Sequence, residues 1–208
     1  MRFITRYGSA LLVGAACTLG ACAKKDATTD SAAVATATPT PDSGAAATTP
    51  ASGAGAGMSA ANIMSMIGLS NAGEIGAGKL ASDKATDADV KAFAKMMVTD
   101  HQAMQKGGDS LATAKGIAPA PPPQAAQKQQ MSDQMMQTLN SSAKGAAFDK
   151  AYIDGQIQGH QQVLSELQGF SSTAPDPDLK AMIDGAIPKV QAHLDRAQQI
   201  QAKLGGKS

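Results

Sequence analysis

Aromatic side chains are scarce in this sequence: tryptophan is absent, and only 3% of the 208 residues are aromatic. A core without them must be built from Leu, Ile, Val, Met and Ala. Eleven methionines and abundant alanine favour helices over sheets. No stretch shows the alternating pattern of a β-strand, so we predict an all-α fold.

A surplus of charge of one sign is also lacking. The formal net charge is +1 at pH 7, so nothing indicates a nucleic-acid partner. The only two cysteines, Cys17 and Cys22, lie near the N-terminus. The rest of the chain therefore offers neither a disulfide framework nor a thiolate metal ligand.

The N-terminus has the pattern of an export signal. Two arginines in MRFITR precede the apolar run YGSALLVGAACTLGA, which is too short for an ordinary membrane span. The run ends in Leu19-Gly20-Ala21-Cys22, which looks like a bacterial lipobox, with cleavage before a lipidated cysteine. Two or more acyl chains, palmitate among them, would attach Cys22 stably to a membrane. The alternative is a plain secretory signal followed by an incidental cysteine.

We therefore expect three segments: a lipoprotein signal peptide at 1–21, a tether at 22–57 and a folded domain at 58–208. The tether consists mainly of Ala, Thr, Pro, Ser and Gly, which cannot bury enough apolar surface to offset the entropy of ordering. Ala23 after the cysteine is compatible with outer-membrane sorting. The expected location is the cell envelope, with the domain facing the periplasm.

Helical periodicity fills the rest of the chain. The predicted helices span residues 60–85, 88–115, 125–141, 146–171 and 178–204. Four are long, about 39 Å each at 1.5 Å per residue, which predicts a four-helix bundle with a short extra helix between the second and third long helices. That connection could run back along the bundle, as in ferritin-like folds. An up-down-up-down bundle with the extra helix on its side is the alternative.

Each long helix carries one ionisable residue on or beside its apolar stripe, near its middle. They are Glu74, His101, His160 and His193, which include every histidine of the chain. Glu74 and His101 lie 13 and 14 residues from the first turn, so their heights match. His160 and His193 lie 14 and 19 residues from the second turn, a mismatch of about 7 Å at 1.5 Å per residue.

A carboxylate and three imidazoles from four helices would make a four-coordinate site for one Cu, Zn or Fe ion. Asp100, Asp149 and Tyr152 could orient these groups from outside the ligand set. The alternative is a metal-free buried network of Glu74 and the histidines in a structural or interaction module. Met97 and Met104 flank His101 and could bind Cu(I), but core packing is the commoner role for such residues.

An enzyme receives little support from the sequence. It shows no nucleophile elbow, phosphate-binding loop or cysteine–base pair. The several glutamates and Glu-x-x-His pairs of dinuclear iron bundles are also missing. Acid–base or redox use of the same cluster stays open as a third hypothesis.

Four segments resemble a known bacterial family. They are EIGAGKLA, VKAFAKMMVTDH, GAAFDKAYIDGQIQGH and IPKVQAHLDRAQ. In this order, over about residues 60–204, they are similar to a family of outer membrane proteins named domain of unknown function 4142. The resemblance implies a ferritin-like fold, export, frequent lipidation and recurring family positions at Glu74, His101, His160 and His193. It implies no reaction.

Overall fold

The computed structural model describes residues 57–206. The predicted signal peptide, Cys22 and all but the last residue of the predicted tether lie outside the described residues. Five helices make up nearly all of the described part: α1 (Ala60–Lys84), α2 (Ala88–Lys115), α3 (Gln124–Ser141), α4 (Ala146–Thr173) and α5 (Pro177–Gly205). No strand occurs between residues 57 and 206. The all-α bundle predicted from the sequence is confirmed.

Local sequence signals set the helix boundaries. Ser59, Asp87 and Asp176 cap α1, α2 and α5 by accepting hydrogen bonds from backbone N–H groups of the first turn. Gly116 ends α2 in the left-handed region at φ 63°, where a side chain is strained. Pro188 lies inside α5, which continues through it.

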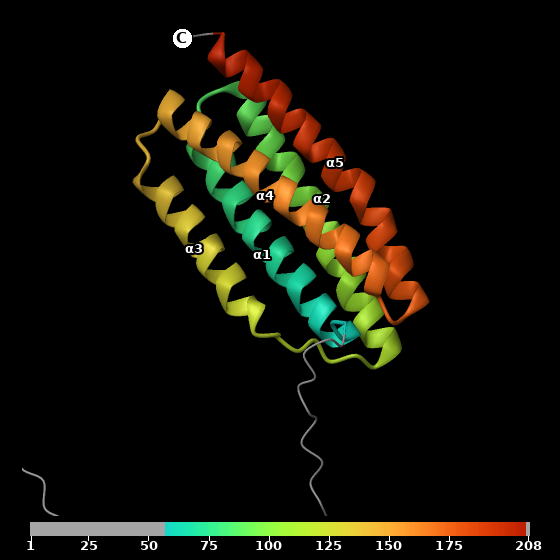
Figure 1. The fold of residues 1–208 in the computed structure, drawn as a ribbon. Coiled ribbons are helices and arrows are strands. Elements are labelled where there is room, and N and C mark those ends of the chain that lie inside the picture. The colour runs from blue at the N-terminus through green and yellow to red at the C-terminus, as the bar shows by residue number, and fades with distance from the viewer. Residues whose placement is uncertain (1–56, 207–208) are drawn as a thin grey trace, which may run out of the picture. The chain divides into compact units, whose positions relative to one another are not determined.

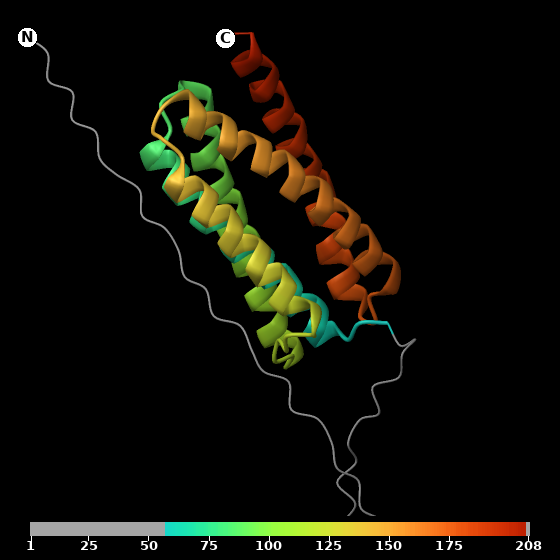
Figure 2. The same cartoon turned by 60° about the vertical axis from the view of Figure 1, so that its left-hand side comes forward.

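The helices form two antiparallel pairs. Helix α1 packs closely along α2, and α4 along α5, whereas contact between the pairs is sparser and runs through α1 with α4 and α2 with α5. Helix α3 runs back along the outside of the bundle before α4 begins (Figures 1 and 2). Consequently α2 and α4 point the same way, so the connectivity is the ferritin-like one with a single long crossover.

Helix α3 docks on α1 and α4 through specific contacts. The Lys84 ammonium donates to the carbonyls of Leu139 and Asn140 at the end of α3, each at 2.8 Å. Cations are favoured at this end of a helix, where backbone carbonyls are unpaired. Near the other end, Lys128 pairs with Glu166 of α4 at 2.6 Å.

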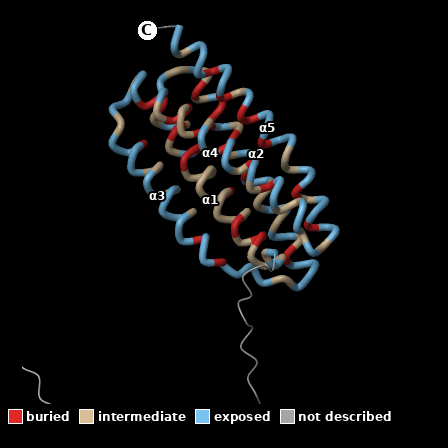
Figure 3. Tube along the Cα trace, viewed as in Figure 1, coloured by how far each residue is buried: buried red, intermediate tan, exposed pale blue. Residues whose placement is uncertain are grey.

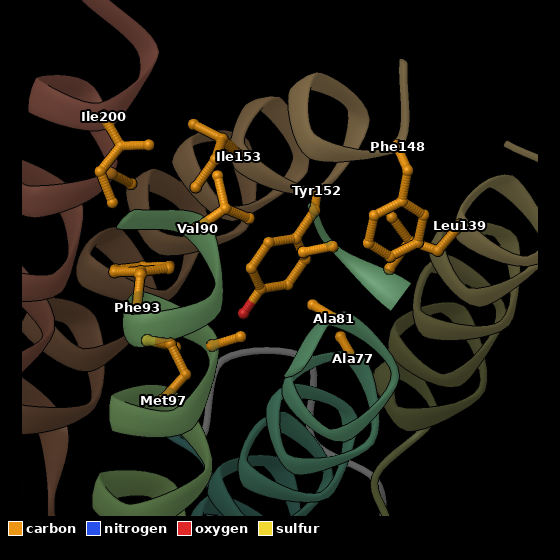
Figure 4. Close-up of a cluster of buried hydrophobic side chains, with 13 residues drawn as sticks. Ala77, Ala81, Val90, Phe93, Met97, Leu139, Phe148, Tyr152, Ile153 and Ile200 are labelled. Atoms are coloured by element: carbon orange, nitrogen blue, oxygen red, sulfur yellow. The ribbon is translucent and has the colours of Figure 1, made fainter. Parts of the chain in front are cut away.

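The core contains two apolar clusters separated by a polar layer. One cluster surrounds Tyr152 and Phe93 and includes Met97 (Figure 4). The other contains Ile63, Leu167 and their neighbours. Buried residues line the inner faces of the long helices (Figure 3). Between the clusters, the buried polar residues are Asn71, His101, Gln156, His160 and His193.

None of the helices within residues 57–206 has the length and apolar character needed to cross a membrane.

Glycine permits the close approach of α1 to α2. A Cβ on Gly78 would lie 2.8 Å from a methyl carbon of Val98 and 3.1 Å from the Ala94 carbonyl oxygen. The valine is β-branched and the carbonyl belongs to the helix backbone, so neither can yield easily. By contrast, a Cβ on Gly76 meets nothing within 4 Å.

These two glycines give a matched stability test. We expect Gly76→Ala to raise the free energy of unfolding by about 0.5–1 kcal/mol, because alanine reduces the entropy lost by the backbone on folding. We expect Gly78→Ala to lower it by about 1–3 kcal/mol through overpacking. Urea denaturation followed by circular dichroism measures both. Equal effects of the two substitutions would contradict the packing argument.

Candidate metal centre

Three imidazoles meet in the polar layer at the middle of the bundle. His101 comes from α2, His160 from α4 and His193 from α5, with exposed fractions of 3%, 2% and 2%. The ring centroids are 5.9 Å apart for His101–His160, 5.4 Å for His101–His193 and 5.5 Å for His160–His193. One ring nitrogen of each lies within 4.8 Å of the other two. The height mismatch expected from the sequence therefore does not keep His160 and His193 apart.

Each imidazole has one nitrogen held by a hydrogen bond. Nδ1 of His160 donates to the backbone carbonyl of Gln156 one turn earlier, at 2.9 Å. Nδ1 of His101 donates to the side-chain oxygen of Asn71 on α1, also at 2.9 Å. Because a carbonyl oxygen can only accept, both contacts place the proton on Nδ1 and the lone pair on Nε2.

His193 is held in the opposite tautomer. Its Nε2 donates to the carboxylate of Asp100 on α2 at 2.9 Å, which leaves the lone pair on Nδ1. Asp100 also lies 3.5 Å from the Lys189 ammonium, one turn before His193 on α5. Asp100 and His101 are neighbours in sequence, so α2 supplies both an imidazole and the carboxylate that orients another.

The nitrogens with lone pairs are the ones without partners. Nε2 of His101, Nε2 of His160 and Nδ1 of His193 are buried and have no hydrogen-bond partner among residues 57–206. An imidazole held by one N–H and presenting the other nitrogen is the usual arrangement of a metal-binding histidine. Three such nitrogens in one place form a set of neutral donors suited to a transition-metal ion.

Burial favours the neutral form of His101 and of His193. Removal from water, reinforced by His160 and His193, lowers the pKa of His101 from 6.5 to about 3. Burial also lowers the pKa of His193, although its hydrogen bond to Asp100 opposes the shift. A neutral imidazole keeps its lone pair available at physiological pH.

Comparison with known proteins places the chain in a family. The family described as "Domain of unknown function (DUF4142)" matches residues 45–200, about three quarters of the chain. The chain belongs to the DUF4142 family. No curated protein sequence matches it.

A solved structure has the same fold as this DUF4142 chain. It is described as "CopM in the Cu(II)-bound form". The match has a TM-score of 0.56 at 16% identity and covers 70% of the DUF4142 chain and 97% of the CopM chain. At this identity the likeness shows a shared helical-bundle fold.

Glu74, the fourth residue of the predicted ligand set, lies beside the histidines of the DUF4142 domain and outside their group. Its Oε2 accepts a hydrogen bond from Gln156 at 2.8 Å. Its Oε1 lies 4.0 Å from Nδ1 of His160, the nitrogen that carries the proton. The carboxylate therefore faces the side of the His160 ring opposite to the free lone pair. It lines a pocket between α1, α3 and α4.

Of the three residues predicted to orient the imidazoles, only Asp100 forms a hydrogen bond to one of them. Asp149 is 11 residues before His160, about 16 Å along α4, and its carboxylate accepts from the Thr86 and Asp87 backbone N–H groups and the Thr86 hydroxyl. It thus holds the α1–α2 turn, because α4 begins at the same end of the bundle.

Tyr152 is also away from the imidazoles. It lies eight residues before His160, about 12 Å along the helix. Its ring packs edge-on against Phe93 at 6.1 Å, inside the apolar cluster (Figure 4). Burial, and then the charge of Glu74, raises the pKa of its hydroxyl well above the usual range.

Sequence reasoning missed Asn71. The α1–α2 turn is centred on residue 86, between Lys84 and Ala88, so Asn71 and His101 lie 15 residues on either side of it. Glu74 is one turn closer to the loop. The sequence does carry a signal for Asn71. It is a polar amide on the buried face of α1, seven residues from each of the buried residues Met64 and Gly78.

The neutral state of His101 predicts an acid-sensitive fold. Between about pH 3 and pH 6.5 the unfolded chain binds a proton at residue 101 that the folded chain does not. Stability should therefore fall as pH drops below 6.5, by at most about 1.4 kcal/mol per pH unit for this group. Urea denaturation of the metal-free protein from pH 7 to pH 5 measures the slope, since the ordinary pKa values of carboxyl groups lie below this range.

The control for this measurement is His101→Gln, which keeps a polar side chain but cannot titrate. We expect its free energy of unfolding to vary less with pH than that of the unsubstituted protein. Identical slopes would show that His101 is not held neutral by the fold.

Proposed function

We propose that this DUF4142 protein binds one transition-metal ion through His101, His160 and His193, as part of metal handling or stress response in the cell envelope. The observation that carries the proposal is a cluster of three histidines in which one ring nitrogen of each lies within 4.8 Å of the other two, and in which each ring has one buried nitrogen with no hydrogen-bond partner among the described residues.

The energetics of burial support a metal. A buried acceptor without a partner costs about 1–3 kcal/mol, and this cluster contains three of them. One ion would engage all three nitrogens. Metal–nitrogen bonds of about 2.0–2.1 Å in a trigonal arrangement require nitrogens about 3.5 Å apart, so an inward movement of about 1 Å from the 4.8 Å limit would suffice.

The structural neighbour adds indirect support. The CopM structure is described as bound to Cu(II), so a bundle of this fold can hold a transition metal. The low identity means that the residues of the present chain must carry the argument.

A metal-free structural module is the second candidate. It is favoured by the hydrogen bonds that join different helices through the polar layer: Asn71 with His101, and Asp100 with His193. Such networks can fix the register of helices. They leave the three lone pairs unexplained.

Substitution of single histidines separates the two candidates. We expect the full chain, purified without a histidine tag, to take up one equivalent of metal, measured by mass spectrometry of the bound elements. His101→Gln, His160→Gln and His193→Gln should each abolish stoichiometric uptake. Metal at 100 times its Kd should stabilise the unsubstituted protein by about 2.7 kcal/mol.

Asp149→Asn is the matched control, because Asp149 stabilises the α1–α2 turn and lies away from the imidazoles. It should lower stability by about 1–3 kcal/mol and leave the uptake at one equivalent. Failure of the unsubstituted protein to bind any transition metal, or uptake that survives all three histidine substitutions, would refute the proposal.

The place of action in this proposal is the outer membrane, with Cys22 as the lipid attachment site and the domain in the periplasm. The signal-like N-terminus ending in Leu19-Gly20-Ala21-Cys22 supports it. Growth with a palmitate analogue should label the protein and leave Cys22→Ala unlabelled. Absence of label from the unsubstituted protein would remove the anchor and leave the bundle's chemistry unaffected.

A further inference from the structure

We propose, in an inference that rests on the proposed metal site, that the cluster of His101, His160 and His193 is selective for monovalent copper, Cu(I), over divalent ions. Three independent features of the structure support this selectivity: the charge of the donors, the charge around them and the number of ligands within reach.

The donors themselves are neutral. The group of side chains that can reach one ion contains three histidines and no carboxylate. An imidazole binds an ion through a neutral ring nitrogen, so none of the three ligands brings a negative charge to the site. Neutral donors do not offset the charge of a bound ion, and the cost of burying an ion rises steeply with that charge.

The surroundings supply about one negative charge. Asp100 is negative, but the Lys189 ammonium lies 3.5 Å from it and offsets its charge. Glu74 lies 4.0 Å from His160, and its hydrogen-bond donor is the neutral amide of Gln156. Lys128 lines the same pocket as Glu74 but pairs with Glu166 at 2.6 Å. A monovalent ion would thus be balanced by Glu74, whereas a divalent ion would leave one positive charge in the core.

The number of available ligands points the same way. Zn²⁺ in proteins is almost always four-coordinate, with water as the fourth ligand when the protein supplies three. Here the three free nitrogens are buried from solvent. The pocket beside the site, about 180 Å³, has a mostly apolar lining that also includes Ser70, Asn71 and Lys189, and it touches His101 alone of the three histidines. A water in this pocket would therefore adjoin His101 and neither of the other two imidazoles, whereas Cu(I) is satisfied by three donors.

Glu74 has a definite role in this arrangement. It is a counter-charge held on the far side of the His160 ring, with no bond to the ion. Its place near the buried stripe is then explained by the charge that the ion brings into the core.

Competition titrations of the full chain test the selectivity. Ag(I) serves as a monovalent probe that does not change oxidation state, and Cu(I) is measured under anaerobic conditions against a coloured Cu(I) chelator. We expect one monovalent ion per chain, lost in His101→Gln, and Zn²⁺ and Cu²⁺ bound at least about a hundredfold more weakly. X-ray absorption of the copper form should show three nitrogen neighbours.

A second variant tests the counter-charge. Glu74→Gln should weaken Ag(I) binding about tenfold while one ion still binds through three nitrogens. Asp109→Asn removes the same charge from an exposed position on α2, two turns after His101. It should change the affinity by less than about twofold, because solvent and salt screen the Asp109 charge. Loss of stoichiometric binding in Glu74→Gln would show that Glu74 is a ligand and would overturn the counter-charge.

The outcomes separate this inference from the function on which it rests. If Zn²⁺ or Cu²⁺ binds as tightly as Ag(I) and the same histidine substitutions remove it, the selectivity is wrong and the metal site stands. If no ion of either charge binds, both proposals fail.

Discussion

An imidazole in a dry core must keep one nitrogen protonated and the other supplied with a partner, and the middle of this bundle is arranged around that requirement. The three N–H groups are directed outward to an amide, a backbone carbonyl and a carboxylate. The three remaining nitrogens are buried and have no partner among the described residues, in a cluster where one ring nitrogen of each histidine lies within 4.8 Å of the other two. Replacing one of these histidines with a side chain that can neither donate nor accept would loosen the polar layer. Two of the three hydrogen bonds, those of His101 and His193, join different helices.

The two-pair construction of the bundle gives this layer its importance. The two helices of each pair pack closely along each other, whereas fewer residues are in contact between the pairs. His101 belongs to the first pair, and His160 and His193 belong to the second. An ion bound at the centre would therefore connect two halves that are otherwise joined mainly by side-chain packing and by the crossover helix.

The sequence predicted the helices well because capping residues, glycines and prolines mark their ends: Asp87 and Gly116 bound α2, as expected. It also identified all three histidines as core residues, since each falls on an apolar stripe. It placed Glu74 level with His101 and missed Asn71, because a shift of three residues along α1 keeps both close to the same face. Only the position of the α1–α2 turn, measured to within one residue, sets Asn71 level with His101.

The predicted mismatch between His160 and His193 is smaller in the structure for a similar reason. The turn between α4 and α5 is centred on residue 175, which leaves a difference of three residues, about 4.5 Å along the axis. Imidazole side chains can cover that difference by leaning along the helix. Asp149 was predicted to orient an imidazole, but the 11 residues between it and His160 correspond to about 16 Å along α4, which is too far for a hydrogen bond.

Because Asp100 and His101 are adjacent on α2 and both serve the site, the site is unusually sensitive to the rotation of α2 about its axis. Successive residues of a helix point about 100° apart, so one of the pair can face the centre while the other faces α5. Insertion or deletion of one residue before this pair would turn both away together, removing an imidazole and releasing His193 at once. The orientation of both side chains therefore depends on the rotation of α2 about its own axis. Chains that lengthen or shorten the helices by whole turns would preserve this orientation, whereas insertions or deletions of a single residue would not.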